Sequence, residues 1–254
     1  MQESLNEKYV LQSVANTLDI LDLLSKQGEL TVPEISAQTG FSKSSVFRML
    51  ATLENRKFIK KSADAKYSLD VKLIVLGNSV IDRLDVIRFG HPMLMELTNR
   101  TGETSHMGIL DGDIFVRVVD KVLSPSTIRT DSYVGFGRRA HLMACGKAIL
   151  SFKPQTFIDA YIRVNDFSPL TDYSITGADQ LLRELELTRQ RGYALDREES
   201  EYGLFCIGAP IFDINHNVIA AVSISGPADR MKKNLDANLP LVLETARKIS
   251  EYMA

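Results

Sequence analysis

TVPEISAQTGFSKSSVFRMLATLENRKFIKK, residues 31–61, decides the fold of the N-terminal part of the chain. Pro33 favours the first turn of a short helix that Thr31 caps, and Gly40 supplies the left-handed residue at which that helix ends. Ser42 caps a second helix. Its apolar residues recur at i, i+3, i+4 and i+7, at Val46, Met49, Leu50 and Leu53. Two short helices joined by a tight turn predict a helix-turn-helix.

The opposite face of the second helix suits a DNA major groove. It carries short polar side chains, two cations and one ring, at Ser42, Lys43, Ser44, Ser45, Phe47 and Arg48. Cations bind phosphates, and small polar side chains reach base edges. From residue 43 to residue 61 six basic residues stand against one acid, although the whole chain has a net charge of −2. The alternative is an ordinary helical hairpin with a solvated basic face, in which Phe47 packs against the first helix.

Residues 58–70, FIKKSADAKYSLD, alternate around a polar tip and predict a two-stranded wing. Lys60 and Lys61 would reach the DNA backbone or the minor groove. The region before the helix-turn-helix, residues 10–26, predicts an amphipathic helix with its apolar side facing inward, at Val14, Leu18, Leu21 and Leu24. We expect a DNA-binding domain at 8–70, a stiff linker helix at 71–83 and a second domain at 84–254.

The second domain alternates paired strands with helices. Residues 103–122 and 204–226 each predict two strands around a polar turn, and residues 126–137 predict a further strand and a loop. Helical patterns precede, separate and follow them, at 86–102, 144–152, 177–195 and 239–254. Strands in pairs favour an antiparallel sheet, so the predicted class is α+β.

Composition indicates an ordinary globular protein. The chain is 44% hydrophobic and 24% charged, so any nucleic-acid site must be local. No apolar run approaches the roughly 20 residues that cross a bilayer, and the N-terminus does not have the pattern of a signal peptide. Two cysteines in 254 residues make no disulfide framework, which favours a reducing cytoplasm. His and Cys show no metal-ligand spacing, so we expect no metal and no cofactor.

Six residues of the second domain are candidates for a small-ligand site: Ala144, Cys145, Asp196, Cys206, Ser223 and Ser225. Free backbone N–H groups at the helix start near Ala144 and Cys145 would cradle a carboxylate. Ser223 and Ser225 share one strand face by their spacing of two. Together these groups would hold a small hydroxy or keto acid. Purely structural roles remain an alternative for these residues. A buried cysteine usually packs as a small apolar side chain, and an aspartate after a helix is often a turn residue.

The chain from about Val10 to Ile249 resembles the IclR family of bacterial transcriptional regulators. The resemblance rests on SKSSVFRMLATLENRKFI, YSL, TGETSHMGILDG, HLMACGKAIL, RGYALDREESEYGLFCIGAPIFD and VSISGP. It implies a winged helix-turn-helix joined by a helix to a GAF-like effector-binding domain, with the DNA-binding and effector residues at the positions given above. The chain departs from the family pattern at Leu142 and Met143, which should narrow the pocket or remove a polar contact, and at Phe205, where the family often has Arg.

We therefore expect a cytoplasmic, sequence-specific transcriptional regulator, not an enzyme and not a membrane protein. As a homodimer or homotetramer it would bind a double-stranded DNA operator with two half-sites, under the control of a small carboxylic acid. Three alternatives differ in class. One is a redox switch that pairs Cys145 with Cys206. Another is an enzyme with Cys206 as nucleophile, assisted by His141 or Asp196. The third is a protein-interaction module built on the winged domain.

Overall fold

The structure is a computed structural model that describes residues 9–81 and 85–253. It divides into two compact units, residues 1–83 and 84–254. The structure does not describe Lys8 and Leu84, at which the two predicted domains start. It also does not describe residues 82 and 83, the last two positions of the predicted linker.

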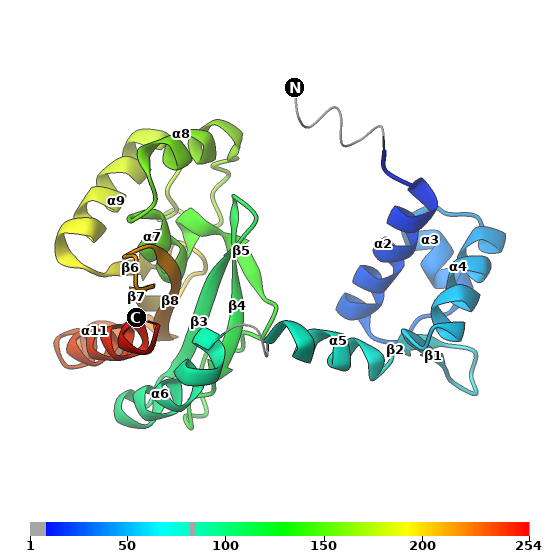
Figure 1. The fold of residues 1–254 in the computed structure, drawn as a ribbon, viewed down its shortest axis with the longest axis horizontal. Helices are drawn as coiled ribbons and strands as arrows, with labels where there is room; N and C mark the ends of the chain where they lie inside the picture. Colours follow the sequence, from blue (N-terminus) through cyan, green and yellow to red (C-terminus); the bar gives the residue numbers. More distant parts are fainter. Residues whose placement is uncertain (1–8, 82–84, 254) are drawn as a thin grey trace. The chain divides into compact units, whose positions relative to one another are not determined.

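The first unit is a winged helix-turn-helix. Its elements are α2 (Gln12–Gln27), α3 (Val32–Thr39), α4 (Lys43–Asn55), β1 (Ile59–Lys61), β2 (Tyr67–Leu69) and α5 (Lys72–Ile81), with β1 and β2 antiparallel (Figure 1). Gly40 ends α3 in the left-handed region, at φ 74°. Ser42 caps α4 by accepting a 3.2 Å hydrogen bond from the N–H of Ser45. The local signals in the sequence therefore set this unit as predicted.

The inward face of α2 differs from the prediction. Val14 and Leu18 are 51% and 56% exposed, whereas Ile20 and Leu24 are buried. The core formed by α3, α4 and the wing includes Ile20 and Leu24 of α2, but it includes neither Val14 nor Leu18. The expectation for Val14 and Leu18 is wrong for the isolated unit.

The second unit combines helices with an antiparallel sheet, as its α+β class predicts. The strands are β3 (Thr104–Asp111), β4 (Phe115–Val122), β5 (Gly137–Arg139), β6 (Ala194–Arg197), β7 (Leu204–Phe212) and β8 (Val218–Pro227). They pair antiparallel in the order β5-β4-β3-β8-β7-β6. The helices are α6 (Asp85–Thr101), α7 (Ala144–Leu150), α8 (Gln155–Val164), α9 (Ala178–Arg191), α10 (Ala228–Lys233) and α11 (Leu235–Tyr252).

Helices cover both faces of this sheet (Figure 1). On one face α6 and α11 pack over an apolar core that includes Val222 and Ile224 of β8. On the other face α7 packs on β7 and β8, with α9 beside it. The alternation along β8 therefore points Ser223 and Ser225 toward the α7 side. In the part of the chain that the structure describes, no helix is long and apolar enough to cross a membrane.

The second unit differs from the sequence-based expectation in one predicted strand and in one helix that was not predicted. Residues 126–137 contain no strand apart from Gly137, where β5 begins, and the preceding segment is irregular. Its backbone forms only two hydrogen bonds with β4 before β5 begins. The N–H of Val118 donates to the carbonyl of Phe136, and the N–H of Gly135 donates to the carbonyl of Val118. The second miss is α8, which the sequence analysis passed over although Ile158 and Tyr161 bury one face of it. Phe157, Ile158, Tyr161 and Ile162 recur at helical spacing, so the sequence did carry a signal for this helix.

Candidate functional site

The helix α4 presents its predicted DNA-binding face to solvent. Seven of the eight predicted residues are exposed and Ser45 is half-buried; the exposed set is Ser42, Lys43, Ser44, Phe47, Arg48, Lys60 and Lys61. Phe47 is 56% exposed, so more than half of its surface is free of the first helix and of the rest of the unit. The opposite face of α4 is anchored in the core by Val46, Leu50 and Leu53. This arrangement holds α4 rigidly while its polar face is free to enter a groove.

The start of α4 and the wing add polar groups beside this face. The hydroxyl of Ser42 lies 3.0 Å from that of Ser44 and donates to that of Ser45 at 2.9 Å. On β1 the ammonium group of Lys61 lies 5.4 Å from the ring centroid of Tyr67. Lys60 alternates to the other side of the same strand. The unit therefore offers hydroxyl donors and cations on two neighbouring elements.

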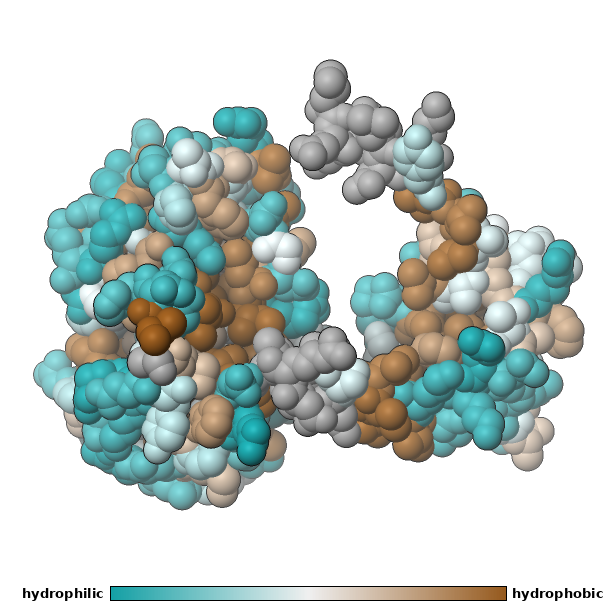
Figure 2. All heavy atoms as spheres, in the orientation of Figure 1, coloured by the Kyte–Doolittle hydropathy of each residue, from teal (hydrophilic) through white to brown (hydrophobic). Residues whose placement is uncertain are grey.

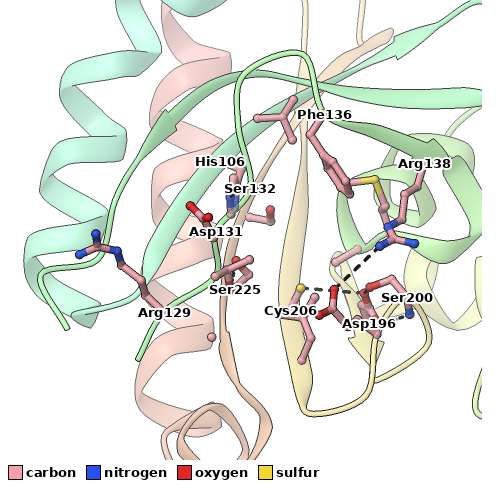
Figure 3. A pocket seen from close by; sticks show the side chains of 18 of the residues that line it. His106, Arg129, Asp131, Ser132, Phe136, Arg138, Asp196, Ser200, Cys206 and Ser225 are labelled. Carbon is pink, nitrogen blue, oxygen red and sulfur yellow. Dashed lines mark hydrogen bonds and ion pairs between the residues drawn. The ribbon is translucent and has the colours of Figure 1, made fainter. Parts of the chain in front are cut away.

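A pocket of about 470 Å³ lies in the second unit, on the α7 side of the sheet (Figure 3). All six residues predicted for the small-ligand site border it: Ala144, Cys145, Asp196, Cys206, Ser223 and Ser225. The strand register explains how they meet, because Cys206 of β7 lies opposite Asp196 of β6 on one side and Ser225 of β8 on the other. Asp196 is thus part of a strand at the sheet edge rather than of a turn.

Two glycines bring the start of α7 close to the sheet and to the preceding chain. A Cβ atom on Gly208 of β7 would lie 2.8 Å from the carbonyl carbon of Ala144. A Cβ atom on Gly146 would lie 2.0 Å from the carbonyl oxygen of Ala140. Only glycine permits both approaches. The N–H groups of Ala144 and Cys145, in the first turn of α7, have no acceptor within the helix, and both residues border the pocket.

Asp196 is buried and held by the turn that follows its strand. Its Oδ2 accepts a 2.5 Å hydrogen bond from the hydroxyl of Ser200, and its Oδ1 accepts a 2.8 Å bond from the N–H of Glu199. Burial raises the pKa of the Asp196 carboxyl, while these hydrogen bonds and the charge of Lys147 oppose the rise. In Figure 3 Asp196, Ser200 and Cys206 lie together on one side of the pocket.

Both thiols of the pocket are protonated at neutral pH. Sγ of Cys145 donates to the hydroxyl of Ser223 at 3.1 Å, and burial raises the pKa of this thiol to about 11. Burial and the neighbouring Asp196 raise the pKa of Cys206 well above its ordinary value. A thiol is the unreactive form, so Cys206 is a poor nucleophile. His141, its suggested partner, does not border the pocket and instead places Nδ1 2.8 Å from the hydroxyl of Tyr161.

The structure adds polar residues that the sequence analysis missed. His106 of β3 borders the pocket, and its Nε2 lies 2.5 Å from the hydroxyl oxygen of Ser132 (Figure 3). Burial, with a contribution from the charge of Lys121, lowers the pKa of His106 to about 4, so the ring is neutral at pH 7. The hydroxyl of Ser225 donates to that of Thr130 at 3.1 Å. Strand alternation places His106 on one face of β3, but only the pairing with β8 reveals that this face is the pocket.

The three departures from the family pattern have different outcomes. Met143 borders the pocket. Leu142 is buried but does not border it, so the expectation that this side chain narrows the pocket is wrong. Phe205 lies in the apolar core on the opposite face of the sheet, since it alternates with Cys206 along β7. Of the three, only Met143 is in a position to affect a ligand.

Comparisons with known families cover both units. Residues 13–63 match the family described as "IclR helix-turn-helix domain". Residues 78–251 match the family described as "Bacterial transcriptional regulator IclR C-terminal". The HTH-type transcriptional regulator KdgR of Dickeya chrysanthemi is 34% identical over 245 residues, covering 96% of this chain and 80% of that protein.

Solved structures show the same fold. The Thermotoga maritima IclR is 33% identical, with a TM-score of 0.80 and coverage of 96% of this chain and 99% of that one. An IclR homologue from Microbacterium hydrocarbonoxydans, complexed with 4-hydroxybenzoate, reaches a TM-score of 0.83 at 17% identity. It covers 95% of this chain and 97% of its own, and at this identity the likeness concerns the fold alone.

Proposed function

The chain belongs to the IclR family of bacterial transcriptional regulators, and from this we propose that a small organic acid in the pocket of the second unit controls its affinity for an operator. The family makes it a DNA-binding regulator rather than an enzyme, and we place it in the cytoplasm, where its operator lies. The observation that carries the proposal is the pocket itself, which gathers all six predicted ligand residues from four separate elements.

The exposed face of α4 supports a recognition role for this helix. We propose that α4 enters the major groove, where Arg48 and Lys43 contact bases and phosphates. Ser44 and Ser45 supply short hydrogen bonds, and the exposed ring of Phe47 contacts a thymine methyl group. Ser42 anchors the helix start near a phosphate, and the wing residues Lys60 and Lys61 neutralise further phosphates. Weakening of operator binding by added salt is the expected consequence.

The first unit also carries an apolar surface that suits a second copy of the chain. Figure 2 shows hydrophobic side chains gathered over α5, and the exposed apolar residues at its start are Val71, Ile74, Val75 and Leu76. Exposed apolar patches mark interaction sites. We propose that this surface joins two copies, which gives the two-fold symmetry that an operator with two half-sites requires. Sedimentation of a Val75→Asp variant tests it: a wild-type oligomeric state would contradict this interface.

The pocket offers complementary groups for a small acid. The N–H groups of Ala144 and Cys145 would bind the carboxylate, and Ser223 and Ser225 would bind a hydroxyl or carbonyl oxygen of the same ligand. Asp196 would accept a hydrogen bond from a ligand hydroxyl. The acid must bind more tightly to one arrangement of the DNA-reading helices than to another. Equal affinity for both arrangements would not change the equilibrium between them. The route that we propose for this coupling is residues 71–90, of which 82–84 lie outside the described residues.

A thermal-shift screen tests the proposal. The purified protein is compared with a Ser223→Ala/Ser225→Ala variant against small carboxylic acids, with 4-hydroxybenzoate among them because a protein of the same fold carries it. A ligand at 100 times its Kd adds about 2.7 kcal/mol to the free energy of unfolding, which raises Tm measurably. A rise that disappears in the double variant supports the site, whereas a rise that the variant retains removes these two hydroxyls from it.

A further inference from the structure

A buried ion pair joins two elements that border the pocket. Lys147 of α7 has no solvent exposure, and its Nζ lies 2.6 Å from each carboxylate oxygen of Glu199. A second acid, Glu184 of α9, lies 3.8 Å from the same ammonium group and also pairs with Arg191 at 2.7 Å. Neither Lys147 nor Glu199 borders the pocket itself. A direct role in holding the acid is therefore excluded for both side chains.

The pair connects two walls of the pocket. Lys147 lies one turn after Ala144, which borders the pocket at the start of α7. Glu199 lies in the turn after β6, and its own N–H donates to Oδ1 of Asp196 at 2.8 Å. The next residue, Ser200, donates its hydroxyl to the other oxygen of the same carboxylate. The ammonium group of Lys147 is thus linked to Asp196 through a single residue.

The turn that Lys147 holds has an unfavourable backbone conformation. Glu198 has φ 65°, in the left-handed region that non-glycine residues rarely adopt. Several contacts keep it there. The hydroxyl of Thr171 donates to the carbonyl of Glu198 at 2.6 Å, and the hydroxyl of Ser174 donates to that of Glu199 at 2.6 Å. A strained turn fixed from several sides is typical of a segment whose position matters.

Stability alone is a weak reason to keep such a pair. Removing two charges from water is costly, and replacing a buried ion pair by apolar residues of similar volume is often neutral or stabilising. Removing only one partner is strongly destabilising, because the remaining charge is buried without compensation. The two kinds of substitution therefore separate a structural role of Lys147 and Glu199 from a positioning role.

We propose that the Lys147–Glu199 ion pair positions Asp196 for the effector by fixing the turn 197–200 against the start of α7. Lys147 and Glu199 are positioning residues that act through Asp196 and Ser200, and the inference rests on the proposed effector function of this pocket. With the pair in place, the carboxylate of Asp196 and the amides of Ala144 and Cys145 keep a fixed separation, which selects the length of the acid between them.

The test compares Lys147→Met, Glu199→Leu and the double variant K147M/E199L, which removes both charges and keeps the volume. The control is R247M/E251L, which removes an exposed pair on α11. Each single variant should lower Tm by on the order of 10 °C, and the double variant should recover most of that loss. For the acid that binds the wild type most tightly, the double variant should show a Kd at least about tenfold higher, and the control an unchanged Kd.

A ligand-free readout keeps this test independent of the proposed function. In a crystal structure of the double variant, the carboxylate of Asp196 should lose its bonds to Ser200 and to the N–H of Glu199's replacement. A folded double variant with wild-type Kd, or with Asp196 in its original place, overturns the inference. If no acid binds the wild type, the proposed function fails and the crystal structure alone decides. If the double variant does not fold, Glu199→Gln decides, since an unchanged Kd and an unmoved Asp196 would overturn the inference as well.

Discussion

His106 and Ser223 lie directly opposite each other where β3 pairs with β8, and both side chains border the same pocket. Each of the two side chains already has a hydrogen-bond partner. Ser223 accepts from the thiol of Cys145, and His106 contacts the hydroxyl of Ser132. At this point of the pocket two neutral polar side chains already have defined partners, so a ligand that binds to them must exchange one hydrogen bond for another. Ionisable side chains also border the pocket, Asp196 and Arg138 among them.

Substitution of His106 should weaken the dependence of stability on pH. The pKa of His106 is about 4 in the folded protein and about 6.5 in the unfolded chain, so the stability that it contributes is present above pH 6.5 and lost as pH falls through 4. His106→Asn should remove roughly 3 kcal/mol of this loss. Denaturant unfolding at several pH values between 4 and 7 measures it. His141, whose pKa is also lowered to about 4, remains in both proteins and cancels in the comparison. Identical pH profiles would contradict the prediction.

Asp196→Asn should show the opposite sign. Burial raises the pKa of Asp196 above its ordinary value of 3.8, so the stability linked to its protonated form is present at low pH and is lost as pH rises through the raised pKa. The variant has no charge to bury and can still accept from Ser200. Its Tm relative to the wild type should therefore increase with pH above 3.8. A difference in Tm that stays constant across this range would show that folding does not raise the pKa of Asp196.

The sequence predicted the first unit and the class of the second because their signals are local. The capping residue Ser42, the left-handed Gly40 and the apolar repeat of α4 act within a few residues of each other. The polar pocket depends instead on pairing between distant strands. His106 could be assigned to a strand face, but nothing local shows that β3 lies beside β8. The irregular segment that carries Ser132 follows the contour of the pocket rather than a periodic pattern, so its prediction as a strand was wrong.

Gly208→Ala should disturb the ligand site more than the fold. The added Cβ would lie within 3.0 Å of the backbone of Ala144 and Cys145, which forces the start of α7 away from β7. Overpacking of this kind costs about 1–3 kcal/mol, so Tm should fall by several degrees. Binding of the effector acid should weaken at the same time, because the displaced amides are those proposed to bind its carboxylate.

The control for this variant is Gly177→Ala. Gly177 stands before α9, and a Cβ atom there meets nothing within 4 Å. Acid binding should remain at the wild-type value in the control, and Tm should fall only slightly, because Ala is a poorer N-cap than Gly. If Gly208→Ala lowers Tm but leaves the Kd for the acid unchanged, the amides of Ala144 and Cys145 are not the carboxylate site.

Arg48→Ala should weaken operator binding while leaving acid-induced stabilisation intact. Arg48 is exposed on α4, and its removal leaves the buried face of the helix untouched. If the guanidinium contacts a phosphate, the slope of log K against log salt should fall by about 1; if it contacts a base, affinity should fall by about 1–3 kcal/mol with relaxed sequence preference. Fluorescence anisotropy with an operator fragment at several salt concentrations separates the two cases.

The matched control is Arg163→Ala, which removes an exposed arginine on α8 of the other unit and should bind the operator as the wild type does. Full operator affinity in Arg48→Ala would remove Arg48 from the interface, and loss of acid-induced stabilisation in this variant would contradict the separation of the two sites.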